Sequence, residues 1–262
     1  MLNLKDINLN VRHYKIIDFV REHGYASIET LTRQFGVSAQ TVRRDIIYLD
    51  NQAVLKRHHG GVGTLPGTKS LSYSSREIEN VGAKNVIGAA IASQISNGAS
   101  LFIDIGTTME AVAEGLLSHE GLTVITNHIG VALILSQNPD FTILIPGGQL
   151  RSRDKAITGD SALEFLNKNR VAYGIFGIGS ITDEGHLLDY DYRDAQLSRH
   201  AMEVCSIKFV AADHSKFNSD AMMPISHVSE INTFFTDKMP PQSIVNSLRE
   251  NDTNLFVGSA KI

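Results

Sequence analysis

Hydrophobic side chains near the start of the chain recur at spacings of three and four, the period of amphipathic helices. Two stripes follow this spacing: Ile16, Ile17 and Val20 in the first, and Ile28, Leu31 and Phe35 in the second. The pattern predicts two short helices between Val11 and Phe35, separated at Gly24.

A third helix is expected after a three-residue connection of Gly36, Val37 and Ser38. Glycine permits the tight turn, and the Ser38 hydroxyl can cap the helix that follows. The next hydrophobic stripe consists of Val42, Ile46 and Leu49. Two helices joined by so short a turn form a helix-turn-helix, which we place at about residues 26–45.

The opposite face of this third helix has side chains suited to reading DNA. It presents Gln40, Arg43, Arg44 and Ile47. Glutamine can pair with adenine and arginine with guanine in the major groove, whereas the hydroxyls of Ser38 and Thr41 suit phosphate oxygens. The alternative is a solvated face on which Arg43 or Arg44 offsets Asp45 and Asp50.

A basic wing is expected directly after this helix. Val54–Val62 read VLKRHHGGV, in which a β-branched and basic run leads to a glycine pair that suits a hairpin. Lys56, Arg57 and His58 could lie along the phosphate backbone or reach the minor groove. His58 and His59 point in different directions on a strand, which argues against a metal pair.

The rest of the chain alternates short β-branched runs with helical stretches. Strands are expected at SLFIDI, LTVITN, FTILI, YGIFGI and KFVAAD, and helices at about 84–95, 109–118, 129–136, 161–167 and 194–204. Such alternation predicts a parallel α/β sheet. Residues 62–80 lack a sustained period, so we expect a DNA-binding domain at 9–64, a linker at 65–79 and an α/β domain at 80–255.

Charge is distributed unevenly between these parts. The chain of 262 residues has a net charge of −4, but residues 1–65 carry +3 and the remainder −7. Only the first part is therefore expected to meet a polyanion. No apolar run approaches the roughly 20 residues that span a bilayer, and charges among the first 15 residues leave no room for a secretory segment. We expect a cytoplasmic protein without a membrane partner.

A candidate phosphate site lies where SLFIDI gives way to Gly106, Thr107 and Thr108, with a helix expected to begin near Met109. The start of a helix presents free backbone N–H groups, and two hydroxyls add donors. The alternative is simple helix capping. Asn127 and the pair Gly147-Gly148 close the next two strands, and ligands of open α/β sheets bind at those ends.

Two arginines follow that glycine pair. Arg151 and Arg153 could clamp phosphate oxygens with planar donor forks, or they could be surface residues paired with Asp154 or Asp160. The acidic residues between Asp183 and Asp194 match no calcium loop or two-histidine motif, so we expect a solvated loop and predict neither a metal nor a cofactor. Cys205, the single cysteine, is expected to be a buried, inert thiol.

The expected DNA-binding domain, called the head below, resembles a known family of regulators. Its run from Arg12 through Ile16 to SAQTVRRDI is similar to the helix-turn-helix signature of the DeoR family of bacterial transcription regulators, and RHHGGV is similar to the wing.

The expected α/β domain, called the body below, carries the same resemblance. It is similar to the DeoR effector domain in the segments DIGTT, TN, GGQLRSRD, GIGSI and DHSKF. The resemblance implies a fold related to ribose-5-phosphate isomerase and the coenzyme A transferases. The resemblance implies ligand contacts from Asp104, Gly106, Thr107, Thr108, Asn127, Gly148, Arg151, Asp194 and Lys216. One departure matters: members usually carry Glu and, four residues later, Lys, where this chain has Asp194 and Ser198.

We therefore expect a repressor, not an enzyme, that binds operator DNA and releases it when a phosphorylated metabolite binds. Within the family, FIDIGTTMEAVA, GGQLRSRD and LLDYDYRD look most like members that govern glycerol metabolism, which implies glycerol 3-phosphate as the inducer. The alternatives are a repressor that responds to another sugar phosphate and a sugar-phosphate isomerase with a DNA-binding head. Because one head rarely binds tightly enough for regulation, a homo-oligomer is expected.

Overall fold

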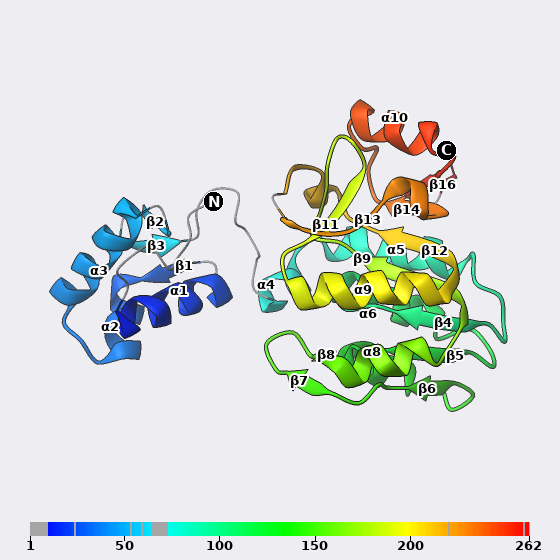
Figure 1. The fold of residues 1–262 in the computed structure, drawn as a ribbon, viewed down its shortest axis with the longest axis horizontal. Helices are drawn as coiled ribbons and strands as arrows, with labels where there is room; N and C mark the ends of the chain where they lie inside the picture. Colours follow the sequence, from blue (N-terminus) through cyan, green and yellow to red (C-terminus); the bar gives the residue numbers. More distant parts are fainter. Residues whose placement is uncertain are drawn as a thin grey trace. The chain divides into compact units, whose positions relative to one another are not determined.

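The chain forms two compact units in a computed structural model that describes residues 10–23, 25–52, 54–58, 60–63, 73–219, 221–258 and 260–261. The head comprises Met1–Ser75 and the body Arg76–Ile262 (Figure 1). Each unit is described below by itself.

The head is a winged helix-turn-helix. Its elements are α1 (Val11–His23), β1 (Tyr25–Ser27), α2 (Ile28–Phe35), α3 (Ala39–Asn51), β2 (Lys56–His58) and β3 (Gly61–Gly63). The three strands form an antiparallel sheet in the order β1-β3-β2. The predicted helices and wing are confirmed, whereas the short strand β1 was not predicted.

The hydrophobic stripes of the head meet in one core. It contains Ile16, Ile17, Val20, Leu31, Val42, Ile46, Leu49, Leu55 and Val62. The predicted turn supplies the angle between α2 and α3, because Gly36 adopts a left-handed conformation with φ 62° that favours glycine. Ser38 then caps α3 by accepting a hydrogen bond from the Thr41 amide at 3.2 Å.

The body contains a larger set of elements around a parallel sheet. They are α4 (Tyr73–Ile78), α5 (Val81–Ala92), β4 (Ser100–Ile103), α6 (Thr107–Leu116), β5 (Thr123–Thr126), α7 (Ile129–Leu135), β6 (Thr142–Leu144), β7 (Gln149–Arg151), β8 (Ala156–Thr158), α8 (Asp160–Asn167), β9 (Val171–Gly177), β10 (Ser180–Ile181), β11 (His186–Asp189), α9 (Tyr192–Val204), β12 (Cys205–Ala211), the 3-10 helix η2 (His214–Asn218), β13 (Met223–His227), the 3-10 helix η3 (Val228–Glu230), β14 (Thr233–Thr236), α10 (Gln242–Glu250), β15 (Asn254–Val257) and β16 (Ala260–Lys261). Part of the segment expected to be a linker is thus helical, since α4 lies within it.

The main sheet has the strand order β16-β15-β14-β12-β9-β4-β5-β6. Its neighbours pair in parallel, except that β16 runs antiparallel to β15 at one edge. The predicted fold class, a winged helix-turn-helix followed by a mostly parallel α/β domain, is confirmed. Two small antiparallel sheets, β10-β11-β13 and the hairpin β7-β8, accompany the main sheet.

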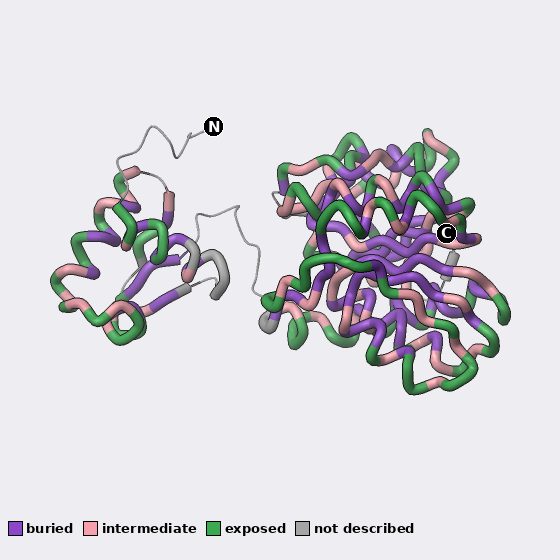
Figure 2. The backbone as a smooth tube through the Cα atoms, turned by 60° about the horizontal axis from the view of Figure 1, so that its bottom comes forward, coloured by how far each residue is buried: buried purple, intermediate pink, exposed green. Residues whose placement is uncertain are grey.

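Helices cover both faces of the sheet and enclose two hydrophobic cores. One core joins the sheet to α5, α6 and α7 through residues such as Ile91, Val112 and Val131, and the other joins it to α8, α9 and α10. Figure 2 shows the buried strands between more exposed outer helices. Helices α5 and α6 approach closely at Gly88, where an added Cβ would lie 2.5 Å from the Ala111 carbonyl oxygen.

The strand order places a topological switch at the centre of the sheet. From β4 the chain proceeds to β5 and β6 on one side, and from β9 it proceeds to β12, β14 and β15 on the other. Ligands of open α/β sheets bind outside the carboxyl ends of the strands at such a point. The loops after β4, β5, β9 and β12 are therefore the place to look for a ligand site. No helix among the described residues is long and apolar enough to cross a membrane.

Candidate DNA-binding and ligand-binding sites

The outer face of α3 carries the predicted base-reading side chains. Gln40, Arg43 and Arg44 are exposed, and Ile47 beside them keeps 41% of its surface accessible. The inner side of the helix is buried through Val42, Ile46 and Leu49. The helix thus turns its polar face outward while its apolar stripe holds it on the head.

Asp45, which follows Arg44 in the sequence, pairs with residues of α1. It is buried, and its oxygens accept bonds from Arg12 at 2.6 and 3.1 Å and lie 3.2 Å from His13 Nε2. The hydrogen bond to Asp45 raises the pKa of Arg12. No ion pair among the described residues joins Arg43 or Arg44 to Asp45 or Asp50, so the offset of charges in the alternative is not observed, whereas the exposure of the face fits a solvated face and a DNA-reading face alike.

The wing is joined to the end of α3 through Asp50. Its Oδ1 accepts a hydrogen bond from the Arg57 amide at 2.9 Å and lies 3.8 Å from Lys56 Nζ. Both basic side chains are exposed. His58 belongs to β2, but its side chain and all of His59 lie outside the described residues. Ser38 is exposed with its hydroxyl 2.9 Å from that of Thr41.

In the body, the predicted phosphate site lies at the start of α6, beside the topological switch. The helix begins at Thr107, two residues earlier than expected, and Gly106 precedes it with φ 122°, a conformation that favours glycine. The N-cap residue is Gly106, which makes no side-chain hydrogen bond to the first turn. The Met109 amide donates to the Gly106 carbonyl oxygen at 3.0 Å, whereas the N–H groups before it are the kind that a helix leaves available to an anion.

Asp104 lies at the end of β4, directly before this helix. Its carboxylate is buried, accepting bonds from the Ile105 amide at 2.8 Å and from the Ser198 hydroxyl at 2.7 Å. Burial raises the pKa of Asp104 to about 8. Ser198, which departs from the usual family residue, is therefore bonded to Asp104, one of the predicted ligand contacts.

Two buried oxygen atoms on segments predicted to bind the ligand lack a hydrogen-bond partner among the described residues, as does Thr236 Oγ1 at the end of β14. The two are Oδ1 of Asn127, after β5, and Oδ1 of Asp194, in the first turn of α9. The residues keep only 2% and 6% of their surfaces exposed. A buried acceptor without a donor is costly, and such atoms mark places where a ligand can donate.

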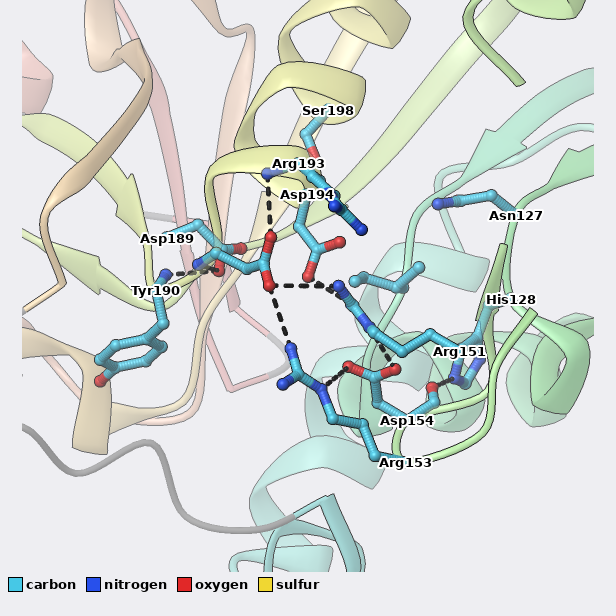
Figure 3. A network of polar contacts seen from close by, with 12 residues as sticks. Asn127, His128, Arg151, Arg153, Asp154, Asp189, Tyr190, Arg193, Asp194 and Ser198 are labelled. Carbon is cyan, nitrogen blue, oxygen red and sulfur yellow. Dashed lines mark hydrogen bonds and ion pairs between the residues drawn. The ribbon is translucent and has the colours of Figure 1, made fainter. Parts of the chain in front are cut away.

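Arg151 connects the hairpin β7-β8 to the start of α9 (Figure 3). Its Nε donates to Asp154 at 2.7 Å, Nη1 to Asp191 at 3.2 Å and Nη2 to Asp194 at 2.6 Å. Burial opposes the charge, but these carboxylates raise the pKa of Arg151. Arg153 is half-exposed and donates to Asp191 at 3.0 Å. Both arginines pair with Asp154, which was one of the expected alternatives, and both also pair with Asp191 at the start of α9.

Only part of the acidic segment that was expected to be a solvated loop is exposed. Asp183 and Glu184 are exposed, but the expectation is wrong for Asp194, which is buried against Arg151. Burial raises the pKa of Asp194 to about 7 and also raises that of Asp189. The reason is tertiary: α9 packs its first turn toward the carboxyl edge of the sheet, and the hairpin covers it.

Lysine side chains lie at the carboxyl edge of the sheet near the end of β12. Lys216 lies in η2, and burial lowers its pKa. Lys84 on α5 is buried as well, which lowers its pKa, and the charge of Asp213 opposes this lowering at both lysines without reversing it. Sequence reasoning missed Lys84 and Asp191. For Asp191 a signal was present, because an Asp directly before a helical run is a capping residue, and here it accepts from the Arg193 amide.

The remaining predicted residues have mainly structural surroundings. Gly148 has φ 147°, and an added Cβ would lie 2.6 Å from the Thr158 carbonyl oxygen, so the hairpin strands need a glycine here. Cys205 is buried and donates to the Ala201 carbonyl, and burial raises its pKa to about 12. Among the described residues no group of three or more His, Cys, Asp or Glu side chains could hold a metal ion.

A winged helix-turn-helix joined to an α/β body with a polar site at its switch point defines a ligand-responsive DNA-binding regulator. Models of two family domains match the chain: the DeoR-like helix-turn-helix domain over residues 12–66 and the DeoR C terminal sensor domain over residues 79–238. The chain belongs to the DeoR family.

Curated relatives cover nearly the whole chain. The glycerol-3-phosphate regulon repressor of Escherichia coli (strain K12) is 39% identical over 93% of this chain and 97% of its own length, and that of Haemophilus influenzae is 41% identical over 97% and 98%. The HTH-type transcriptional repressor CsqR of E. coli is 35% identical over 98% of both chains. All three are named repressors and not enzymes.

Solved structures resemble the fold more distantly. Ribose 5 phosphate isomerase A from Neisseria gonorrhoeae aligns with 12% identity and a TM-score of 0.39 over 52% of this chain and 53% of its own. The tetrameric eIF2B-beta2-delta2 complex from C. thermophilum aligns with 13% identity and a TM-score of 0.46 over 95% and 97%.

Proposed function

We propose that the protein is a transcriptional repressor whose binding to operator DNA is relieved by a phosphorylated metabolite, and that this metabolite is glycerol 3-phosphate. The observation that carries the proposal is the uncapped start of α6 beside two buried acceptors, Asn127 Oδ1 and Asp194 Oδ1. A phosphate suits the N–H groups of the helix, and ligand hydroxyls suit the two acceptors. The similarity to glycerol-3-phosphate regulon repressors supports this particular ester.

On the head, α3 would enter the major groove. Gln40, Arg43 and Arg44 would read base edges, and Ser38 and Thr41 would bind phosphates. Lys56, Arg57 and His58 of the wing would follow the backbone. The exposure of the α3 arginines supports these roles, because a base-reading side chain must be accessible.

In the body, Gly106, Thr107 and Thr108 would bind the phosphate. Arg151 and Lys216 would supply positive charge, with Arg153 nearby at the rim. The hydroxyls would meet Asp104, Asn127 and Asp194, and Gly148 would shape the adjoining hairpin. Arg151 retains N–H groups beyond the three it shares with carboxylates, since a guanidinium has five.

The wider organisation follows from these roles. We place the DNA-binding domain at 9–64, the linker at 65–79 and the effector domain at 80–255, in a protein that acts in the cytoplasm as a homo-oligomer. A single helix-turn-helix reads one half-site, whereas operators are commonly two-fold.

The test is Thr107→Glu, measured by operator binding with and without glycerol 3-phosphate. A carboxylate at the start of α6 would repel the phosphate, so the variant should bind operator but no longer release it. The matched control is Thr142→Glu, which adds the same charge at an exposed residue at the start of β6. A Thr107→Glu protein that still responds as the wild type does would contradict the phosphate site.

A further inference from the structure

The hairpin turn between β7 and β8 joins two sides of the ligand site to the segment that leads out of the body toward the head. Arg151 at one end of the turn donates to Asp194 and Asp191 on α9. Its Nε also donates to Asp154 within the turn, so the arginine and the turn move together. Any ligand that attracts Arg151 acts on this turn.

Lys155, at the other end of the turn, holds α4 and α6. Its Nζ donates to Glu77 on α4 at 2.9 Å and to Glu110 on α6 at 3.3 Å. Lys155 adopts φ 58°, which is unfavourable for a residue with a Cβ. Its carbonyl oxygen also accepts the Ile129 amide at 2.9 Å, so the position is fixed by main chain and side chain together.

Glu110 connects this bridge to the proposed phosphate site. It lies in the first turn of α6, directly after the N–H groups proposed to bind the phosphate. Its carboxylate occupies the space beside Gly130, where an added Cβ would lie 1.9 Å from Oε1. The Glu110 side chain thus packs against α7, so a movement of α6 moves this carboxylate relative to Lys155.

Helix α4 is held at its other end by a loop of the same site. Lys84 Nζ donates to the carbonyl oxygens of Arg76 and Glu79, which ends α4. Asn80 donates to Asp213 at 3.0 Å, in the loop that carries Lys216. Every one of these bonds lies within the body, and α4 spans the boundary between the two units at residues 75 and 76.

We propose that the Glu77–Lys155–Glu110 bridge is a relay that transmits effector binding from the hairpin to α4 and so to the head. The proposal rests on the proposed function. A phosphate that attracts Arg151 through its remaining N–H groups shifts the turn, and the shift separates Lys155 from Glu77. Glu77 and Lys155 are positioning residues that touch neither DNA nor effector.

The test is Glu77→Gln, Lys155→Gln and the double variant, with operator affinity measured with and without saturating glycerol 3-phosphate. Glutamine at 155 keeps the Cβ and hence the same backbone strain. Each variant should weaken operator binding without effector by about two- to fivefold, the range of an exposed ion pair, and leave binding with effector unchanged. The double variant should lose no more than Lys155→Gln alone, because that change already removes the bond to Glu77 along with the bond to Glu110.

Linkage supplies a second readout that a merely structural role would not move. Since the bridge no longer opposes the shift, glycerol 3-phosphate should bind Glu77→Gln more tightly than wild type, by the same factor. The matched control is Glu114→Gln, which neutralises an exposed acid on α6 that is not part of the bridge. Variants that keep both wild-type operator affinities overturn the relay. A wild type that ignores glycerol 3-phosphate overturns the proposed function and the relay with it.

Discussion

The Ser198 hydroxyl lies 2.7 Å from the Asp104 carboxylate and donates a hydrogen bond to it. Ser198 is on α9 and Asp104 follows β4, so the bond joins the two halves of the sheet's carboxyl edge. It favours the charged form of an acid whose burial raises its pKa to about 8.

This pair gives the body a pH-dependent stability. In the unfolded chain the pKa of an Asp is about 3.9, so between that value and about 8 the folded protein holds a proton that the unfolded chain has lost. The free energy of unfolding therefore falls as pH rises through this window, by up to about 1.4 kcal/mol per pH unit. Asp104→Asn should reduce this slope in denaturant unfolding, and Ser198→Ala should extend it to higher pH. Equal slopes in wild type and Asp104→Asn would contradict the buried, protonated acid.

Arg44→Ala should weaken specific operator binding by about 1–3 kcal/mol and remove the preference at one base pair. The reason is that the exposed guanidinium would form paired bonds to a guanine edge. Arg44→Lys is the informative control, because it keeps the charge but not the planar fork, and should lose base preference while keeping the salt dependence. The measurement is binding to a panel of operators with single base changes, on which an unaltered preference would remove Arg44 from base reading.

Arg57→Ala should weaken binding to all DNA sequences alike. A wing arginine that neutralises one phosphate releases about one counterion, so the slope of log affinity against log salt should fall by about 0.9. The check is a salt titration with operator and with unrelated DNA. A wild-type slope for the variant would place the wing away from the backbone.

Asp45→Asn should destabilise the head by about 1–3 kcal/mol, because the buried carboxylate binds Arg12 with two bonds. Hydrogen exchange in the full-length protein measures this as faster exchange of α1 and α3 amides. Asp50→Asn, at the end of the same helix, should spare α1 and affect the wing instead. Unchanged protection of α1 in Asp45→Asn would show that the ion pair does not hold the helix.

Two glycines of α5 should respond in opposite directions to the same substitution. Gly88→Ala should cost about 1–3 kcal/mol, because the new Cβ would meet the Ala111 carbonyl oxygen at 2.5 Å. Gly82→Ala has nothing within 4 Å and should stabilise the helix by about 0.5–1 kcal/mol. Denaturant unfolding of both variants checks the difference, and similar losses in the two would argue against close packing at Gly88.

Sequence patterns located the elements whose signals are local. The apolar run before Asp104, the glycine at 106 and the helix after it follow one another in the chain, so they could be predicted together. Strands β14 and β15 and helix α10 were not predicted, although β14 and β15 have as many residues as β4 and β5, which were. The small sheet β10-β11-β13 was not predicted either, because β13 joins the other two strands only after helix α9 and strand β12 have intervened in the chain.

The polar partners in the site depend on long-range packing. Arg151 and Asp194 are 43 residues apart and meet only because the hairpin lies over the first turn of α9. Sequence reasoning named both as ligand contacts but could not pair them. It also treated the surrounding acids as solvated, because composition shows charge and not burial.

Nearly all the side chains proposed to contact the ligand come from segments that follow strands or begin helices at one edge of the sheet, whereas the two hydrophobic cores lie behind that edge. The residues of the hydrophobic cores are thus not those proposed to recognise the ligand. Exchanges in a few such segments can alter the chemistry of the pocket while the scaffold persists, so a lineage of such regulators can acquire new inducers by small steps, without passing through an unfolded ancestor.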